Sequence, residues 1–273
     1  MSNYKSSKKR VIKQNTSGFD MDDFEQRMQE CIDSGGKMLD LSNLGLKVLP
    51  SKLPSTIEHL SISDNNIKEL PDLKYLKCLK VFDCCSNKLS YINNLPHIHE
   101  LNCRNNDIQD ITYLEGNKLL QRLDITNNSL TVLPNIENIV ILECSTNRLR
   151  SICNFIKLRR LVATDNKLIL IENLPRLESI DITNNRVEEL PPFEKMEHLT
   201  CDNNMLSKLN KYREAKYLSF VGNDIKYLPF VKKLKEVVCD YTDIILDGKY
   251  KIASHDITIL KKKQISTIIL NSQ

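Results

Sequence analysis

The chain has 273 residues, of which 41% are apolar, with 7 glycines, 9 prolines and no tryptophan. This composition excludes collagen-like and low-complexity chains and supplies enough apolar side chains for a substantial core. The formal net charge is +4, but the first 13 residues carry five basic residues and no acidic one, which leaves −1 for the rest of the chain. A nucleic-acid-binding domain carries a basic face on its folded part, so nucleic-acid binding by the folded part is not expected.

Residues 1–17 are polar, basic and rich in serine, which predicts a disordered tail. Their basic run KSSKKRVIK leaves one alternative function open, a nuclear or nucleic-acid-associated protein that acts through this tail. No apolar stretch typical of a signal peptide follows the basic residues, and no run reaches the roughly 18 apolar residues of a membrane span. We therefore expect an intracellular protein, in the cytoplasm or nucleus of the producing or host cell, without a membrane anchor.

Residues 18–36 are predicted to form an N-terminal capping helix. Aspartates suit its start, and Gly35 and Gly36 suit its end. Apolar side chains recur at three- and four-residue spacing, which is typical of one helical face. That predicted face consists of Met21, Phe24, Met28 and Ile32. The helix is expected to cover the edge of the strand that follows.

A repeat with the pattern LxxLxLxxNxLxxL occupies residues 37–246. Its spacings are 22, 19 and 22 residues, then 19 residues six times, and with a partial first copy they give about eleven units. The first positions of the complete units are Ile57, Leu79, Ile98, Leu120, Ile139, Leu158, Leu177, Met196, Ala215 and Leu234. Apolar positions four and six are two residues apart, so both point inward from one short strand per unit. The strands are expected to stack into a parallel sheet.

Position nine of the unit is asparagine in nine successive copies. An amide has two donor hydrogens and one acceptor oxygen, and buried turn backbone needs such partners. We expect a structural ladder of Asn65, Asn87, Asn106, Asn128, Asn147, Asn166, Asn185, Asn204 and Asn223. The ladder is interrupted at both ends, by Leu44 in the first unit and Thr242 in the last. Terminal units are atypical because each has only one neighbour.

The other side of each unit is short and contains recurrent prolines. A unit of 19 residues leaves about ten for this side, too few for a long helix, so extended or 3₁₀ segments are expected there. After Ile244 the pattern fails, and residues 247–273 are expected to form a C-terminal cap. Their alternation of apolar and basic residues fits either a closing strand or a short helix, and both alternatives stay open at this point.

These units resemble those of the leucine-rich-repeat superfamily. LPSTIEHLSISDNNIKELP is similar to the short repeats of bacterial effector proteins, and IENLPRLESIDITNNRVEEL resembles units of the phosphatase-regulator type. The resemblance implies an α/β solenoid, with a parallel sheet on the concave face that binds proteins. Some short-repeat effectors add a ubiquitin-ligase domain. Fewer than 30 residues follow Ile244 here, so we expect no such domain in this sequence.

Cysteines and histidines are weak candidates for chemistry. Five cysteines share inward position six, where a free thiol behaves as a small apolar side chain, namely Cys84, Cys103, Cys144, Cys201 and Cys239. Cys84 and Cys103 lie on neighbouring strands, so a disulfide is conceivable by distance, but a reducing compartment disfavours it. The five histidines are scattered, and no CxxC pair or known enzyme motif occurs. We expect no catalytic site, no metal and no cofactor.

The concave face is the best candidate site, at positions three, five, seven and eight. Ile141 and Val162 are apolar where polar residues are expected, and Arg122 and Arg160 flank Ile141. Exposed apolar groups beside arginines resemble the centre of a protein interface, although single surface apolar residues are also common. The remaining predicted partner-binding residues are Asp124, Glu143, Asp181, His198 and Tyr217. The sequence thus predicts a monomeric, non-catalytic scaffold for an unidentified partner protein.

Overall fold

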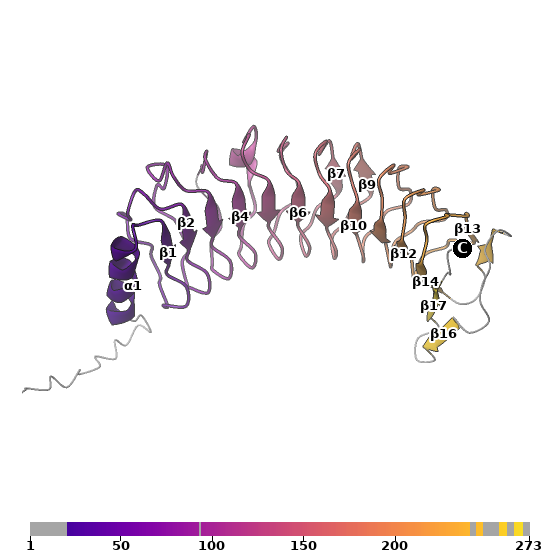
Figure 1. The fold of residues 1–273 in the computed structure, drawn as a ribbon, viewed down its shortest axis with the longest axis horizontal. Coiled ribbons are helices and arrows are strands. Elements are labelled where there is room, and N and C mark those ends of the chain that lie inside the picture. The colour runs from indigo at the N-terminus through magenta and orange to yellow at the C-terminus, as the bar shows by residue number, and fades with distance from the viewer. Residues whose placement is uncertain (1–20, 93, 241–243, 248–256, 261–264, 270–273) are drawn as a thin grey trace, which may run out of the picture.

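The computed structural model describes residues 21–92, 94–240, 244–247, 257–260 and 265–269. The repeat units stack side by side into a curved array, with helix α1 (Met21–Asp33) at one end. Figure 1 shows the strands following one another along the array in chain order. The predicted tail, residues 1–17, lies outside the described residues.

The main sheet has one short strand from each of eleven successive units. Neighbouring strands are parallel and pair position for position, so that Ile141 lies beside Arg160 and Glu143 beside Val162. These strands are β1 (Met38–Asp40), β2 (His59–Ser61), β3 (Val81–Asp83), β4 (Glu100–Asn102), β5 (Arg122–Asp124), β6 (Ile141–Glu143), β8 (Arg160–Val162), β10 (Ser179–Asp181), β11 (His198–Thr200), β12 (Tyr217–Ser219) and β14 (Glu236–Asp240). The predicted parallel-sheet solenoid is confirmed.

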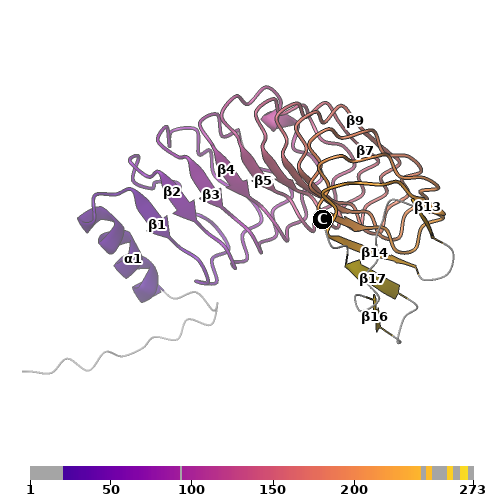
Figure 2. The same cartoon turned by 45° about the vertical axis from the view of Figure 1, so that its right-hand side comes forward.

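Within the described ranges, the outer side of the array is built from extended pieces and a short 3₁₀ turn, as predicted. Strand β7 (Ser151–Cys153) pairs with β9 (Leu170–Glu172), β13 (Tyr227–Leu228) pairs with β15 (Ile245–Leu246), and η1 (Thr112–Leu114) is the 3₁₀ turn. Figure 2 shows β7, β9 and β13 on the opposite side of the coils from the main sheet.

The carboxyl-terminal end of the sheet is extended by antiparallel strands. Strand β17 (Ile265–Ile269) pairs with β14, and β16 (Ile257–Leu260) pairs with β17 (Figure 1). Of the two alternatives for this region, a strand or a helix, these segments are therefore strands. The rest of the predicted C-terminal cap after Asp247 lies outside the described residues.

A single apolar core runs through all the units. Positions one, four, six and eleven are buried along the array, as in Ile139, Leu142, Cys144 and Leu149, each with 0–1% exposure. Burial of a leucine-sized side chain contributes roughly 1.5–3 kcal/mol, and stacking on both sides makes that burial complete within the array.

The inward cysteines are free thiols. All five are buried, including Cys84 and Cys103, between which no disulfide forms. The Sγ of Cys84 instead donates a hydrogen bond to the carbonyl of Asn102 at 3.4 Å. Burial raises the pKa of the Cys239 thiol to about 11, and it raises the pKa of Cys144 further. These thiols remain protonated and act as packing residues.

The asparagines at position nine form a column whose hydrogen bonds join each turn to the unit before it. The Oδ1 of Asn147 accepts the amide of Leu130 at 3.0 Å, and its Nδ2 donates to the carbonyls of Ile125 at 2.9 Å and Cys144 at 3.1 Å. The same pattern recurs from Asn65 to Asn223. These bonds account for buried turn groups that have no other backbone partner. Thr242, where the column ends, lies outside the described residues.

The residue before each of these asparagines has a left-handed backbone. Its φ is between 52° and 55° at Asp64, Asn105 and Asn203, and 69° at Gly222. Asparagine, aspartate and glycine tolerate this conformation better than other residues. The turn geometry thus explains why polar residues gather at position eight.

Helix α1 covers the first strand, but its buried face differs from the predicted one. Phe24, Met28 and Cys31 pack on the core, whereas Met21 and Ile32 are 47% and 54% exposed. A 13-residue helix is about 20 Å long, while the three-residue strand beneath it spans roughly 10 Å. The prediction was therefore wrong at both ends, because the helix extends beyond the strand that it covers.

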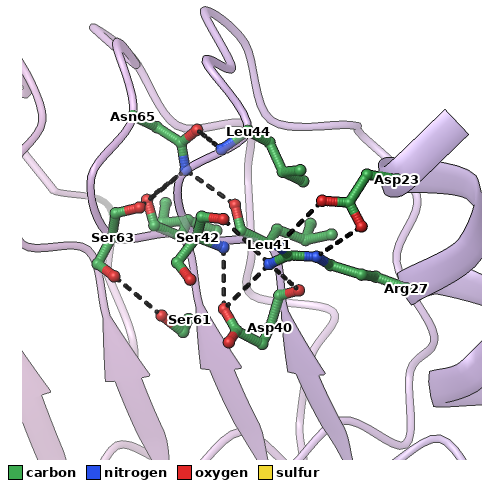
Figure 3. A network of polar contacts seen from close by, with 10 residues as sticks. Asp23, Arg27, Asp40, Leu41, Ser42, Leu44, Ser61, Ser63 and Asn65 are labelled. Atoms are coloured by element: carbon green, nitrogen blue, oxygen red, sulfur yellow. Dashed lines mark hydrogen bonds and ion pairs between the residues drawn. The ribbon is translucent and has the colours of Figure 1, made fainter. Parts of the chain in front are cut away.

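Arg27 fastens this helix to the first unit, as Figure 3 shows. Its guanidinium pairs with Asp23 at 3.0 Å and donates to the carbonyls of Ser42 at 3.0 Å and Asp40 at 3.3 Å. The hydrogen bond with Asp23 raises the pKa of Arg27, so the charge is retained. The carbonyl of Asp40 lies at the end of β1 and that of Ser42 lies just after it, where an edge strand needs partners.

Candidate functional site

The concave face has a hollow of about 270 Å³ over strands β3 to β6. Its lining comes from positions three and five of four successive units, together with the strand backbone between them. The lining residues are Val81, Phe82, Asp83, Glu100, Leu101, Asn102, Arg122, Leu123, Asp124, Ile141 and Glu143. Four of the predicted partner-binding residues, Arg122, Asp124, Ile141 and Glu143, therefore lie together in one depression.

Aliphatic side chains border this hollow. Val81 lies on β3 and Ile141 on β6, both half-buried and both at position three. Val162 is half-buried on β8, beside Glu143 and diagonal to Ile141. This register is the one that the repeat predicts. The aliphatic groups have exposed area left for a partner to cover.

The two arginines are paired with acids on neighbouring strands. Arg122 Nε is 3.7 Å from Glu100 Oε2, and Arg160 Nε is 3.9 Å from Glu143 Oε1. Both arginine side chains are more than half exposed, so each pair stabilises the fold by at most about 1 kcal/mol. These charges remain available to a partner.

The aspartates at position five have a role that sequence reasoning missed. The Oδ1 atoms of Asp40, Asp83, Asp124 and Asp181 accept the backbone N–H two residues further on, at 2.9–3.0 Å. Such bonds hold the turn that leaves the strand. The acidic residues at position five are thus partly structural. Glu143, one methylene longer at the same position, pairs with Arg160 instead.

The remaining predicted residues lie farther along the array. Asp181, His198 and Tyr217 belong to β10, β11 and β12, outside the hollow. Conversely, the predicted site omitted Val81, Asp83, Glu100 and Asn102. Val81 has the signal that selected Ile141, an apolar residue at position three, and could have been found by it.

A larger hollow of about 760 Å³ lies away from the concave columns. Its lining is largely apolar and comes from the first turn of α1 and from the outer segments of the first two units, including Met21, Val48 and Pro50. This hollow belongs to the junction between the capping helix and the array. It contains no row of charged positions like that over β3 to β6.

Across the described ranges, no group of three or more histidine, cysteine, aspartate or glutamate side chains is placed to hold a metal ion. Within the same ranges, no helix has the length and apolar character needed to cross a membrane.

Several solved structures share this architecture. YopM from Yersinia enterocolitica WA-314 aligns with a TM-score of 0.75 and 26% identity, over 86% of this chain and 53% of that one. InlJ from Listeria monocytogenes aligns with a TM-score of 0.56 and 18% identity, over 87% of this chain and 66% of that one. This chain thus spans about half the length of the YopM chain.

Sequence similarity to a characterised protein is local. A segment of 48 residues is 42% identical to the E3 ubiquitin-protein ligase SspH1 of Salmonella typhimurium, which is 18% of this chain and 7% of the ligase. No protein-family model matches the chain. The in-phase repeat, the parallel-sheet solenoid and these structural likenesses together show a leucine-rich-repeat fold.

Proposed function

We propose that the chain is a non-catalytic scaffold that binds a partner protein on its concave face. One observation carries the proposal, namely the hollow over β3 to β6, where half-buried aliphatic side chains border charged ones. Interface centres combine such apolar contacts with arginine, and solenoids use their concave surfaces for binding. The local similarity to SspH1 covers too little of that ligase to carry its activity to this chain.

The proposal includes an intracellular location and a monomeric free state. Sedimentation equilibrium of the purified chain checks the second of these. The runner-up function is association with nucleic acid through residues 1–17, whose basic run is the feature that favours it. Binding through the tail would weaken steeply with salt, because bound cations replace counterions on the phosphates.

The test compares two isoleucines that differ in place. Ile141→Asp puts a charge on the concave face, while Ile169→Asp makes the same change at a side chain that is 58% exposed and lies outside the strands of the main sheet. We expect Ile141→Asp to lose the protein captured from the source cells, Ile169→Asp to keep it, and both to have unchanged circular dichroism. Capture that survives Ile141→Asp but requires residues 1–17 would contradict the proposal and favour the tail.

A further inference from the structure

The hollow over β3 to β6 has the size of a side chain. Its volume of about 270 Å³ lies below the roughly 300–1,000 Å³ of pockets that enclose drug-sized ligands. It is open along the concave face, with strand backbone as its floor. An occupant of this volume is one long side chain presented by a larger partner.

The charge of the hollow selects a cation. Four carboxylates line it, from Asp83, Glu100, Asp124 and Glu143, against one guanidinium, from Arg122. That guanidinium is already 3.7 Å from Glu100. Among the described residues, Asp124 uses only Oδ1, for the amide of Thr126, and no hydrogen bond is made to its Oδ2. A guanidinium from a partner matches paired carboxylates in charge and in forked geometry.

The aliphatic side chains that border the hollow indicate which residues of the partner flank that cation. Val81 and Ile141 are three strands apart, roughly 14 Å at the usual strand spacing. In an extended peptide, side chains two residues before and two residues after a given residue share its face and are roughly 13 Å apart. A peptide that crosses the strands can therefore place an arginine in the hollow while aliphatic side chains at both flanking positions contact Val81 and Ile141.

We propose that the partner presents an extended segment with the pattern aliphatic-x-arginine-x-aliphatic, and that its arginine enters the hollow. This inference rests on the proposed function and specifies the chemistry of the partner. The acids that attract the cation also repel acidic proteins and nucleic acids, since like charges in close contact are disfavoured.

The test uses the full chain and nine-residue labelled peptides, with binding followed by fluorescence anisotropy. One peptide has arginine at its centre and valines two residues to either side, with serine elsewhere. A second replaces arginine by glutamate, and a third replaces both valines by serine. We expect the first to bind at least about tenfold more tightly than either of the others.

Protein variants locate the binding. Glu143→Lys should weaken binding of the arginine peptide at least about tenfold, and Glu143→Gln should weaken it less. Glu189→Lys is the matched control, because Glu189 is exposed and lies outside the main sheet. Equal binding of the arginine and glutamate peptides, binding of none of them, or indifference to Glu143→Lys would overturn the inference. In those cases the proposed function still stands if Ile141→Asp alone loses the captured partner.

Discussion

Acidic side chains have different roles in the two halves of the concave face. In the C-terminal half, Asp202 accepts the hydroxyl of Ser219 at 2.7 Å and the amide of Val221 at 2.9 Å. The nearby Asp240 accepts the amide of Gly222 at 2.7 Å. In the N-terminal half, over β3 to β6, Glu143 lies only within ion-pair distance of Arg160, at 3.9 Å.

This difference shows that an acidic column is not a binding surface by composition alone. A carboxylate that holds backbone donors of its own or a neighbouring unit is part of the fold, and its removal leaves those donors without partners. A carboxylate in an exposed ion pair contributes little to stability and keeps its charge for a partner. The hollow over β3 to β6 has both kinds, whereas Asp202 and Asp240 are of the first kind.

The comparison assumes that the turns of both halves are held by the same hydrogen bonds. Substitutions in the asparagine column test this assumption. Asn147 and Asn204 each bond to the preceding and their own turns, at 2.9–3.1 Å. Asn147→Ala and Asn204→Ala should each lower the free energy of unfolding by about 1–3 kcal/mol, because buried turn groups lose their partners. Urea unfolding checks this. Losses that differ by more than about 1 kcal/mol, well above the usual scatter of about 0.5 kcal/mol, would show that the halves differ beneath their surfaces.

The next largest effect is expected at Asp202. Asp202→Ala removes the acceptor for Ser219, which is only 2% exposed, and for the amide of Val221. We expect a loss of about 1–2 kcal/mol in unfolding free energy, with partner capture retained. Ser219→Ala removes the buried hydroxyl itself, so no donor is left without an acceptor. This variant should therefore lose less stability. Loss of capture by a stably folded Asp202→Ala protein would indicate that the partner binds the C-terminal half, which would contradict the proposed site.

Glu143→Ala should give the opposite result. Its ion pair with Arg160 is long and partly exposed, so unfolding free energy should change by less than about 0.5 kcal/mol. Partner capture should be strongly reduced, because the hollow loses one of its carboxylates. Thermal unfolding and capture are measured on the same preparation. A clear drop in stability with unchanged capture would remove the distinction between the halves.

The repeat pattern predicted the buried positions of this molecule, but only part of the contacts on its concave face. Buried positions such as Leu142 and Cys144, and amides such as Asn147, follow from spacing, because every unit imposes the same geometry on them. The use of Asp124 for the Thr126 amide depends on the turn after the strand, which the pattern does not specify. The contacts of Arg27 could not be predicted in this way, because the junction between the helix and the first unit is not repeated along the chain.

The smallest effect concerns the acidity of Asp202. Burial raises the pKa of this carboxyl above its ordinary value, and the charges of Asp181 and Asp240 act in the same direction, while the bonds from Ser219 and Val221 oppose them. A raised pKa in the folded protein means that the protonated form is relatively favoured by folding. This contribution to stability is fully present below the ordinary pKa and is lost as the pH rises through the folded pKa.

Asp202→Asn removes this titration while keeping one acceptor oxygen. We therefore expect the unfolding free energy of the parent, relative to that of Asp202→Asn, to fall as the pH rises from about 3 to about 6, a range that begins below the ordinary carboxyl pKa of about 3.9. Groups that titrate alike in both proteins cancel in this difference. An NMR titration of the Asp202 carboxyl carbon gives the folded pKa directly. A value at or below the ordinary one would mean that the bonds from Ser219 and Val221 outweigh burial, so that Asp202 stabilises the fold as a charged group rather than in spite of its charge.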